Sequence, residues 1–346
     1  MHKGKFYFQW HITNMCNLKC LHCYQERFDS KEDCKEYVLL KIADKIFTFL
    51  AKYNFSSEIT LTGGEPLLKK EIYRLLNLFE ENELVTSVDI VTNGTLLNLD
   101  VIEKLKKYCK LRYVKVSLDG GLPSINDNIR GKNIFNIVIE KIKLLKEANF
   151  NVIVMFTVMK MNKHTIGEVI DMAKEMGIKG VVFEKFVPIG NGGRLQNEVL
   201  SAKEMLEVYN YILSYAGLQT EPEELVKYRG LWVKFSSSSG EDSSCKIEEV
   251  RGGLCSAGDN SLCILADGRL LPCRRFFLPI GDLSVPEVSL EEVWFNSEVI
   301  KNIRDRNMLK GSCGKCTIEN CYGCRAIAYV LYNDYLAEDP QCWLCN

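Results

Sequence analysis

Three cysteines lie close together near the start of the chain, at Cys16, Cys20 and Cys23 in the segment TNMCNLKCLHCYQ. Thiolates at this spacing are ligands for zinc or for an iron–sulfur cluster. A structural zinc site is closed and four-coordinate, and it is often built from CxxC pairs. No second pair is nearby, although His22 offers a fourth ligand. Three thiolates on a four-iron cluster would instead leave one iron open to bind another molecule.

The other cysteines are unevenly distributed, which predicts a second metal region near the C-terminus. The 346 residues include fifteen cysteines, of which ten lie between Cys245 and Cys345. The opening MHKGKFYFQW has no apolar core or cleavage site of a signal peptide, so we expect a cytoplasmic protein. The cytoplasm keeps thiols reduced, so we do not expect disulfides. We interpret the two clustered groups as metal ligands, and Cys34 and Cys109 as structural residues.

The composition is that of a globular protein and excludes some classes of partner. The net charge is −1, with 26% charged and 47% hydrophobic residues, which gives no support to a nucleic-acid partner. The longest apolar run, VIVMFTVM at 152–159, is too short to span a membrane. We expect neither nucleic acid nor membrane as a partner.

Strand-like and helix-like segments alternate over the first 190 residues and predict the scaffold of these sites. The strand candidates are FYFQWHI, SEITLTG, SVDIVTN, RYVKVSL, FNVIVMFTV and GVVFEKF, with helical patterns at 35–53, 69–83, 98–110, 132–148 and 163–177. Six such units predict an α/β fold with a parallel sheet, either open or curled into a partial, TIM-like (β/α)6 barrel.

The unusual residues gather at one end of the predicted strands. The cysteine triad follows strand one, GGEP follows strand two, TNG follows strand three, SLDG closes strand four and VPIGNGG follows strand six. Carboxyl ends of parallel strands are where such sheets place their active sites. This one-sided distribution favours a functional role over ordinary turns.

The alternation of strand-like and helix-like segments ends after a helical pattern near 201–216. The stretch SSSSGEDSS at 236–244 is typical of an exposed loop or linker. Beyond it, LCILADGRLLPC predicts a hairpin with Asp267 and Gly268 in its turn. We therefore predict a barrel over 1–200, a helix and polar linker over 201–250, and a cysteine-rich domain over 251–346.

The combination of CNLKCLHC, GGEP, TNG and SLDG resembles the radical S-adenosylmethionine (SAM) superfamily. The resemblance implies that Cys16, Cys20 and Cys23 hold a catalytic [4Fe–4S] cluster whose open iron binds the methionine amino and carboxylate groups of SAM. Reductive cleavage of SAM then gives a 5′-deoxyadenosyl radical, which abstracts hydrogen from the substrate. In such enzymes the cofactor carries the chemistry and the protein orients it.

The same resemblance assigns the remaining SAM contacts residue by residue. It implies that the GGE segment meets the methionine amino group, because glycine allows a close backbone approach. Arginine pairs well with a carboxylate, as expected at the methionine carboxyl end. The implied contacts are Gly63, Gly64 and Glu65 for the amino group, Ser117 and Arg130 for the carboxylate, and His22 and Val187 for the adenine. Asn93 and Asp119 are either pocket residues or ordinary turn and cap residues.

The C-terminal cysteines resemble a SPASM domain, which carries auxiliary [4Fe–4S] clusters in some radical SAM enzymes. Twelve residues lie between Cys255 and Gly268, and four between Gly268 and Cys273, as in that family. The block CGKCTIENCYGC is tighter than the family pattern by one residue in each of its last two gaps. Zinc is the alternative ligand for this block.

The SPASM resemblance implies one or two auxiliary clusters and assigns cysteine ligands to each. The distal cluster would be held by Cys313, Cys316, Cys321 and Cys342, and the proximal one by Cys255, Cys273 and Cys324. The fourth proximal ligand stays open between Cys245, Cys263, Cys345 and an open iron.

The SPASM subset mostly modifies peptides and proteins, so we expect maturation of a ribosomally synthesised peptide, by a thioether or carbon–carbon crosslink or by epimerisation. Sulfatase-maturing relatives use an Asp base where this sequence has Arg274, and Arg stays protonated. The chain starts directly at strand one, so we expect a separate leader-binding protein, a short substrate or a substrate that is not a peptide.

Three alternatives to peptide maturation stay open. Within the class, the rival is a radical SAM enzyme of haem biosynthesis, since Arg274 and Arg275 suit haem propionates as well as acidic peptides. From other classes, we consider an iron–sulfur electron-transfer protein and a zinc-binding adaptor. The expected reductant of the enzyme is flavodoxin or ferredoxin.

Overall fold

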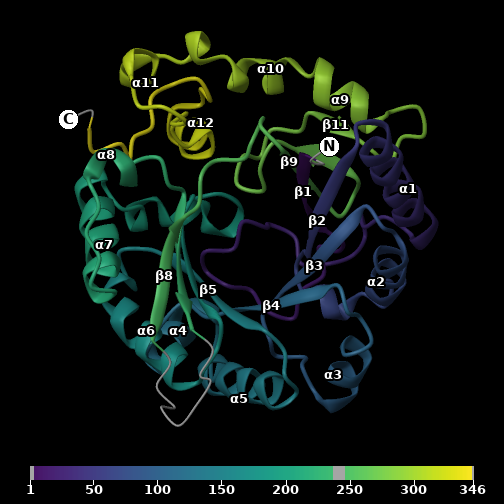
Figure 1. The fold of residues 1–346 in the computed structure, drawn as a ribbon, viewed down its shortest axis with the longest axis horizontal. Helices are drawn as coiled ribbons and strands as arrows, with labels where there is room; N and C mark the ends of the chain where they lie inside the picture. The colour runs from purple at the N-terminus through teal and green to yellow at the C-terminus, as the bar shows by residue number, and fades with distance from the viewer. Residues whose placement is uncertain (1–3, 237–245, 345–346) are drawn as a thin grey trace.

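The computed structural model describes residues 4–236 and 246–344, and its fold is a parallel sheet curled into a partial barrel (Figure 1). Among these residues, eleven strands form one sheet in the order β11-β10-β9-β1-β2-β3-β4-β5-β6-β7-β8. Strands β1 to β6 pair parallel with one another. The predicted α/β fold with a partial barrel is confirmed.

The six parallel strands correspond to the six candidates of the sequence analysis. They are β1 (Gly4–His11), β2 (Phe55–Thr62), β3 (Val85–Thr92), β4 (Leu111–Ser117), β5 (Val152–Val158) and β6 (Gly180–Lys185). The helices on the outside of the barrel are α1 (Glu36–Lys52), α2 (Ile72–Glu81), α3 (Leu99–Leu105), α4 (Pro123–Arg130), α5 (Ile134–Glu147), α6 (Ile166–Glu175) and α7 (Ala202–Tyr215). Short 3₁₀ turns lie at Pro66–Leu68, Lys163–Thr165 and Gly190–Glu198. Helix α4 is an addition that the sequence analysis did not predict.

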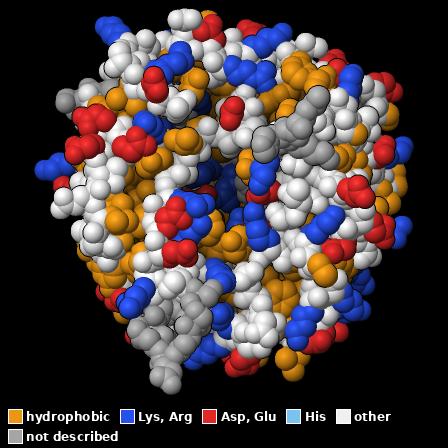
Figure 2. Space-filling model, in the orientation of Figure 1, with side chains coloured by type: hydrophobic (Ala, Val, Ile, Leu, Met, Phe, Trp, Pro, Cys, Tyr) orange, Lys and Arg blue, Asp and Glu red, His pale blue; other side chains and the backbone are white. Residues whose placement is uncertain are grey.

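The two faces of each strand have different roles because successive side chains alternate. In β4, Val114 and Val116 are buried in the apolar core, which they share with Val138 of α5. Lys115 and Ser117 alternate with them and line internal cavities of the barrel. The barrel therefore has an apolar wall outside and a polar interior. Figure 2 shows this interior as a central hollow with Lys and Arg side chains around it.

The C-terminal part extends the sheet at both edges. On one side, β7 (Gly230–Phe235) and β8 (Ile247–Gly252) add two antiparallel strands after β6. On the other, β9 (Ser261–Ile264) pairs parallel to β1, followed by β10 (Arg269–Leu271) and β11 (Gly281–Asp282). The sequence analysis did not predict β7 and β8. The predicted linker 236–244 lies, except for Ser236, outside the described residues.

The predicted β9–β10 hairpin is confirmed, and its turn explains the glycine. Gly268 has φ +95°, a conformation that L-residues with side chains rarely adopt. The Leu265 N–H donates to the Arg269 carbonyl at 2.8 Å and closes the turn. The remaining helices are α8 (Pro222–Leu225), α9 (Leu290–Asn296), α10 (Glu298–Arg304), α11 (Gly311–Lys315) and α12 (Arg325–Tyr332), with a 3₁₀ turn at Arg306–Met308. In Figure 1, α9 to α12 lie between α8 and α1. In the described part of the chain, no helix has the length and apolarity needed to cross a membrane.

An aromatic cluster joins the barrel to the C-terminal part. The ring of Phe6 in β1 lies 5.3 Å from that of Phe49 in α1 and 4.8 Å from that of Trp294 in α9. Phe6 is fully buried, whereas its neighbour Tyr7 is 36% exposed. The cluster thus fixes β1, the strand that leads into the cysteine loop, against two other elements.

We predict that Phe6→Ala lowers the free energy of unfolding by about 3–5 kcal/mol, because it leaves a cavity among packed rings. The measurement is guanidinium denaturation of the reconstituted protein under anaerobic conditions. Tyr7→Ala on the same strand is the matched control and should change the free energy by less than about 1 kcal/mol. Equal effects of the two substitutions would contradict the packing role assigned to Phe6.

Candidate active site

The loop that follows β1 brings the three N-terminal cysteines to one cavity. Cys16, Cys20 and Cys23 are unpaired thiols that line the same cavity of about 120 Å³ at the carboxyl ends of the strands. Burial raises the pKa of Cys16 to about 11 and that of Cys23 to about 12. A metal must therefore displace these protons when it binds. The three soft donors and the space between them fit an iron–sulfur cluster.

The glycines after β2 form a cradle for this loop. The Gly64 N–H donates to the Thr13 carbonyl at 2.7 Å, and the Glu65 N–H donates to the Met15 carbonyl at 2.8 Å. A Cβ atom on Gly63 would lie 2.3 Å from the Thr13 oxygen, and one on Gly64 would lie 2.3 Å from the Met15 oxygen. Both glycines line the cavity, so their backbone borders the space beside the thiols.

The Glu65 backbone contacts the cysteine loop, but its side chain points away from the cavity. It is fully buried and points to the loop after β3, where its carboxylate accepts the Thr92 hydroxyl at 2.8 Å and the Asn93 N–H at 2.7 Å. Burial raises the pKa of this carboxyl to about 7, although these hydrogen bonds oppose the shift. The carboxylate does not line the cavity. Glu65 therefore holds two loops together, and its neighbour Asn93 faces Cys16, with Nδ2 at 3.9 Å from the sulfur.

A buried carboxylate links two other residues predicted at the SAM site. Asp119 Oδ2 lies 2.6 Å from Arg130 Nη2 and 3.0 Å from His22 Nε2. Burial opposes ionisation of Asp119, but Arg130 and His22 outweigh it and hold the pKa of the carboxyl well below its usual range. Arg130 also comes within 4.0 Å of the Cys20 sulfur. Asp119 thus fixes both side chains beside the cysteine loop.

The structure brings most of the sequence-predicted residues to this one cavity. His22, Gly63, Gly64, Ser117, Arg130 and Val187 line it together with the three cysteines. Asn93 also lines it, whereas Glu65 and Asp119 do not. Sequence analysis missed Tyr24 and Glu184. Tyr24 donates its hydroxyl to the Gly63 carbonyl at 3.1 Å. The signal for Glu184 was a charge inside the otherwise apolar strand GVVFEKF.

The C-terminal cysteines form two further groups. Cys313, Cys316, Cys321 and Cys342 line one small cavity with Asp339. Cys255 and Cys273 line the interior barrel cavity of about 470 Å³. Burial raises the pKa of the Cys255 thiol to about 11, and Cys324 is near enough to contribute to this shift. The first group has the members of the predicted distal set, and Cys255, Cys273 and Cys324 are those of the predicted proximal set, so both assignments stay predictions. In the described ranges, no three His, Cys, Asp or Glu side chains are close enough to hold a single metal ion.

Cys263, a candidate for the fourth proximal ligand, lies in the same cavity as Cys255 and Cys273. Cys263 of β9 is buried, and its pKa is raised by burial and by Cys273. Cys245 and Cys345, the other candidates, fall outside the described residues. Cys263 therefore stays a proposed ligand.

Comparison with known proteins identifies the class of enzyme. Residues 10–176 match the profile of the radical SAM superfamily, and residues 255–324 match that of the SPASM iron–sulfur cluster-binding domain. The chain is a radical SAM enzyme with a C-terminal SPASM domain, and the predicted family is confirmed. The two domains bring a SAM-binding [4Fe–4S] cluster and auxiliary clusters. When bound and reduced, the catalytic cluster and SAM supply a 5′-deoxyadenosyl radical for hydrogen abstraction.

Individual relatives are similar to this chain over nearly its whole length. An AdoMet-dependent heme synthase of Methanosarcina barkeri is 29% identical over 96% of this chain and 95% of its own length. An Fe-coproporphyrin III synthase of the same organism is 28% identical over 97% of this chain and 87% of its own. Among solved structures, Streptococcus suis SuiB bound to its precursor peptide SuiA has a TM-score of 0.73 at 18% identity, covering 99% of this chain and 76% of SuiB. The last likeness shows the fold alone.

We predict that Gly64→Ala lowers SAM cleavage by about 100-fold. The added Cβ would push the cysteine loop away from the Gly64 backbone and so displace the three cysteine ligands. The measurement is 5′-deoxyadenosine formed per unit of iron. Gly193→Ala is the control, since a Cβ there would meet its nearest neighbour, the Pro188 oxygen, at 3.8 Å. Cleavage by Gly64→Ala at the rate of the unsubstituted enzyme would contradict the cradle.

The ammonium group of Lys185 is buried between the barrel and the cysteine-rich part, and it makes the stability of the fold depend on pH. Among the described residues, Lys185 Nζ has no hydrogen-bond partner, and it lies 5.8 Å from the ring centres of Tyr209 and Trp343. Burial lowers its pKa from 10.5 to about 8, although Asp339 opposes the shift. Above pH 8 the folded chain releases this proton while the unfolded chain keeps it, so stability rises with pH.

We therefore predict that the free energy of unfolding, relative to that of Lys185→Met, rises by about 1.4 kcal/mol per pH unit above pH 8. Denaturation curves of both proteins between pH 7 and pH 10 measure this difference. A difference that does not change with pH would contradict the buried, unpaired state of Lys185.

Proposed function

We propose that this radical SAM enzyme abstracts hydrogen from a ribosomally synthesised peptide. The observation that carries the proposal is an outer cleft that meets the SAM cavity. This cleft of about 700 Å³ shares Tyr24, Gln25 and Arg274 with the cavity of the three cysteines. We propose that an extended chain follows this cleft from the surface towards the three thiols. A precursor peptide, with a separate leader-binding protein, suits such a route, and flavodoxin or ferredoxin is the proposed reductant.

The chemistry of the cleft favours a substrate of mixed character. Apolar side chains in it include Ile189, Leu265 and Phe277. Its arginines are neutralised in ion pairs, such as Arg269 with Asp267 at 2.7 Å. A peptide offers apolar side chains and main-chain hydrogen bonds to such a surface, whereas a polyanion needs cations without partners.

The arginines at the junction are also paired. Arg274 forms an ion pair with Glu184, and Arg275 Nη2 lies 3.5 Å from the same carboxylate. Arg274 also lies over the Tyr24 ring, 5.6 Å from its centre. Burial opposes ionisation of Glu184, but the two arginines outweigh it and lower its pKa. Glu184 is therefore a weak base, which agrees with the sequence-based argument against sulfatase maturation. We propose that this group positions the substrate.

The second candidate is a tetrapyrrole of haem biosynthesis. It is favoured by the sequence relatives named heme synthase and Fe-coproporphyrin III synthase, which match nearly the whole chain. Iron coproporphyrin carries several carboxylates, and guanidinium groups bind carboxylates in a bidentate way. In this case Arg274 and Arg275 would exchange Glu184 for propionate groups.

One assay separates the two candidates. The reconstituted enzyme, reduced with SAM, is offered a deuterated precursor peptide taken from reading frames beside the gene, and separately iron coproporphyrin III. We expect deuterium in 5′-deoxyadenosine and a mass change or an inverted stereocentre in the peptide. Decarboxylation of the porphyrin with an unchanged peptide would overturn the peptide proposal in favour of the haem candidate.

We further predict that Arg274→Ala lowers product formation from the accepted substrate by at least about 30-fold, which corresponds to about 2 kcal/mol. The substitution removes a partly buried charged contact and leaves Glu184 without that partner. Product is quantified by mass spectrometry at equal iron content. Arg251→Ala, at an exposed arginine of β8, is the control and should have no effect. An Arg274→Ala enzyme as active as the control would show that this arginine does not position substrate.

A further inference from the structure

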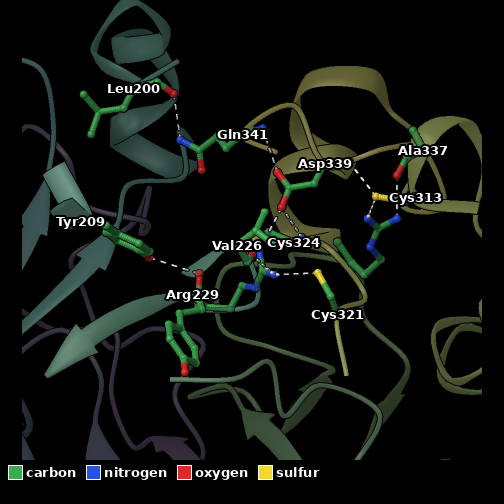
Figure 3. Close-up of polar contacts among 12 residues, drawn as sticks. Leu200, Tyr209, Val226, Arg229, Cys313, Cys321, Cys324, Ala337, Asp339 and Gln341 are labelled. Atoms are coloured by element: carbon green, nitrogen blue, oxygen red, sulfur yellow. Dashed lines mark hydrogen bonds and ion pairs between the residues drawn. The ribbon is translucent and has the colours of Figure 1, made fainter. Parts of the chain in front are cut away.

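A buried ion pair lies among the C-terminal cysteines and has no part in the function proposed so far (Figure 3). Arg229, just before β7, places Nη1 at 2.9 Å from Asp339 Oδ2. Its Nη2 donates to the Val226 carbonyl at 3.0 Å and points to the Cys321 sulfur at 3.8 Å. Arg229 and Asp339 are both more than nine-tenths buried. A guanidinium is thus fixed against one thiol of the distal set.

Asp339 contacts both sets of auxiliary cysteines. Its carboxylate accepts the Cys324 N–H at 2.7 Å, on the proximal side. Its own N–H donates to the Cys313 sulfur at 3.3 Å, on the distal side. The segment is tied to the barrel because Gln341 Nε2 donates to the Leu200 carbonyl at 2.9 Å. These contacts, drawn in Figure 3, hold the Arg229–Asp339 pair between the two groups.

A second guanidinium reaches the distal thiols from the other direction. Arg325 Nη2 lies 3.5 Å from the Cys313 sulfur. Its Nη1 donates to the Ala337 carbonyl at 2.6 Å and to the Tyr335 carbonyl at 3.0 Å, so its orientation is fixed. Arg325 is also buried, at 3% exposure. Two of the four distal thiols therefore face a buried cation.

The physical effect of such cations on an iron–sulfur cluster has a definite sign. Reduction adds one electron and makes the cluster more negative. A cation or an N–H donor beside a ligand sulfur stabilises the reduced form and raises the potential. Burial strengthens the effect because water does not screen the charge.

We propose that Arg229, positioned by Asp339, and Arg325 raise the reduction potential of the distal auxiliary cluster. Both are positioning residues that act through the cysteine sulfurs. The proposal rests on the assignment of Cys313, Cys316, Cys321 and Cys342 to that cluster. It does not depend on whether the substrate is a peptide or a tetrapyrrole, because no substrate enters the test.

The test is a redox titration of the reconstituted holoenzyme with dithionite, which gives one electron per cluster, followed by EPR. The distal signal is the one that Cys313→Ala/Cys321→Ala lacks. We expect Arg229→Gln to lower the equilibrium constant for reduction by about tenfold, which is about 59 mV for one electron. Arg325→Gln should shift the potential in the same direction.

Lys310→Gln is the matched control. Lys310 is close in sequence to Cys313, but its side chain is 62% exposed and pairs with Asp334. Solvent screens such a charge, so the potential should not change. An iron-replete Arg229→Gln or Arg325→Gln protein with an unshifted potential would overturn the proposal, as would an equal shift in Lys310→Gln. Loss of the distal iron in both arginine variants would also overturn it, since it would assign them a purely structural role.

Discussion

The active site depends on the contact between the backbone after β2 and the loop after β1. Two hydrogen bonds, from Gly64 to Thr13 and from Glu65 to Met15, fix the start of the cysteine loop. Only glycine fits there, because any Cβ would overlap the carbonyl oxygens of Thr13 and Met15. The thiols of Cys16, Cys20 and Cys23 can therefore share one cavity although no secondary structure holds them.

Three carboxylates, two of them buried and one partly buried, organise the polar interior that surrounds this contact. Asp119 joins Arg130 and His22 at the SAM side, Glu184 joins Arg274 and Arg275 at the junction of the cavities, and Asp339 joins Arg229 to the cysteine-rich part. A buried charge is tolerated when it is paired and hydrogen-bonded. Each carboxylate in turn fixes cations that face a thiol or the substrate route. These three carboxylates are thus paired, and the contacts with their partners fix the side chains in place.

Much of this site followed from the sequence because spacing and strand order are local properties. The cysteine spacing, GGEP and the ends of the six parallel strands were sufficient to predict the residues that now line one cavity. What the sequence could not reveal are contacts between distant segments. Glu184 meets Arg274 and Asp339 meets Arg229 only after the chain has folded, and no pattern near either residue marks its partner. Strands β7 and β8 were missed for a related reason, since they flank the polar stretch that predicted a linker and are added antiparallel to a parallel sheet.

The most direct measurement is an iron count and a SAM cleavage assay on the anaerobically reconstituted protein. Three [4Fe–4S] clusters predict about twelve iron atoms per chain, with 5′-deoxyadenosine formed on reduction. A Cys16→Ala/Cys20→Ala/Cys23→Ala variant should keep about eight iron atoms and form no 5′-deoxyadenosine. Cleavage of SAM by that variant, or a fully loaded enzyme that does not cleave SAM, would contradict the assignment of these three thiols to the catalytic cluster.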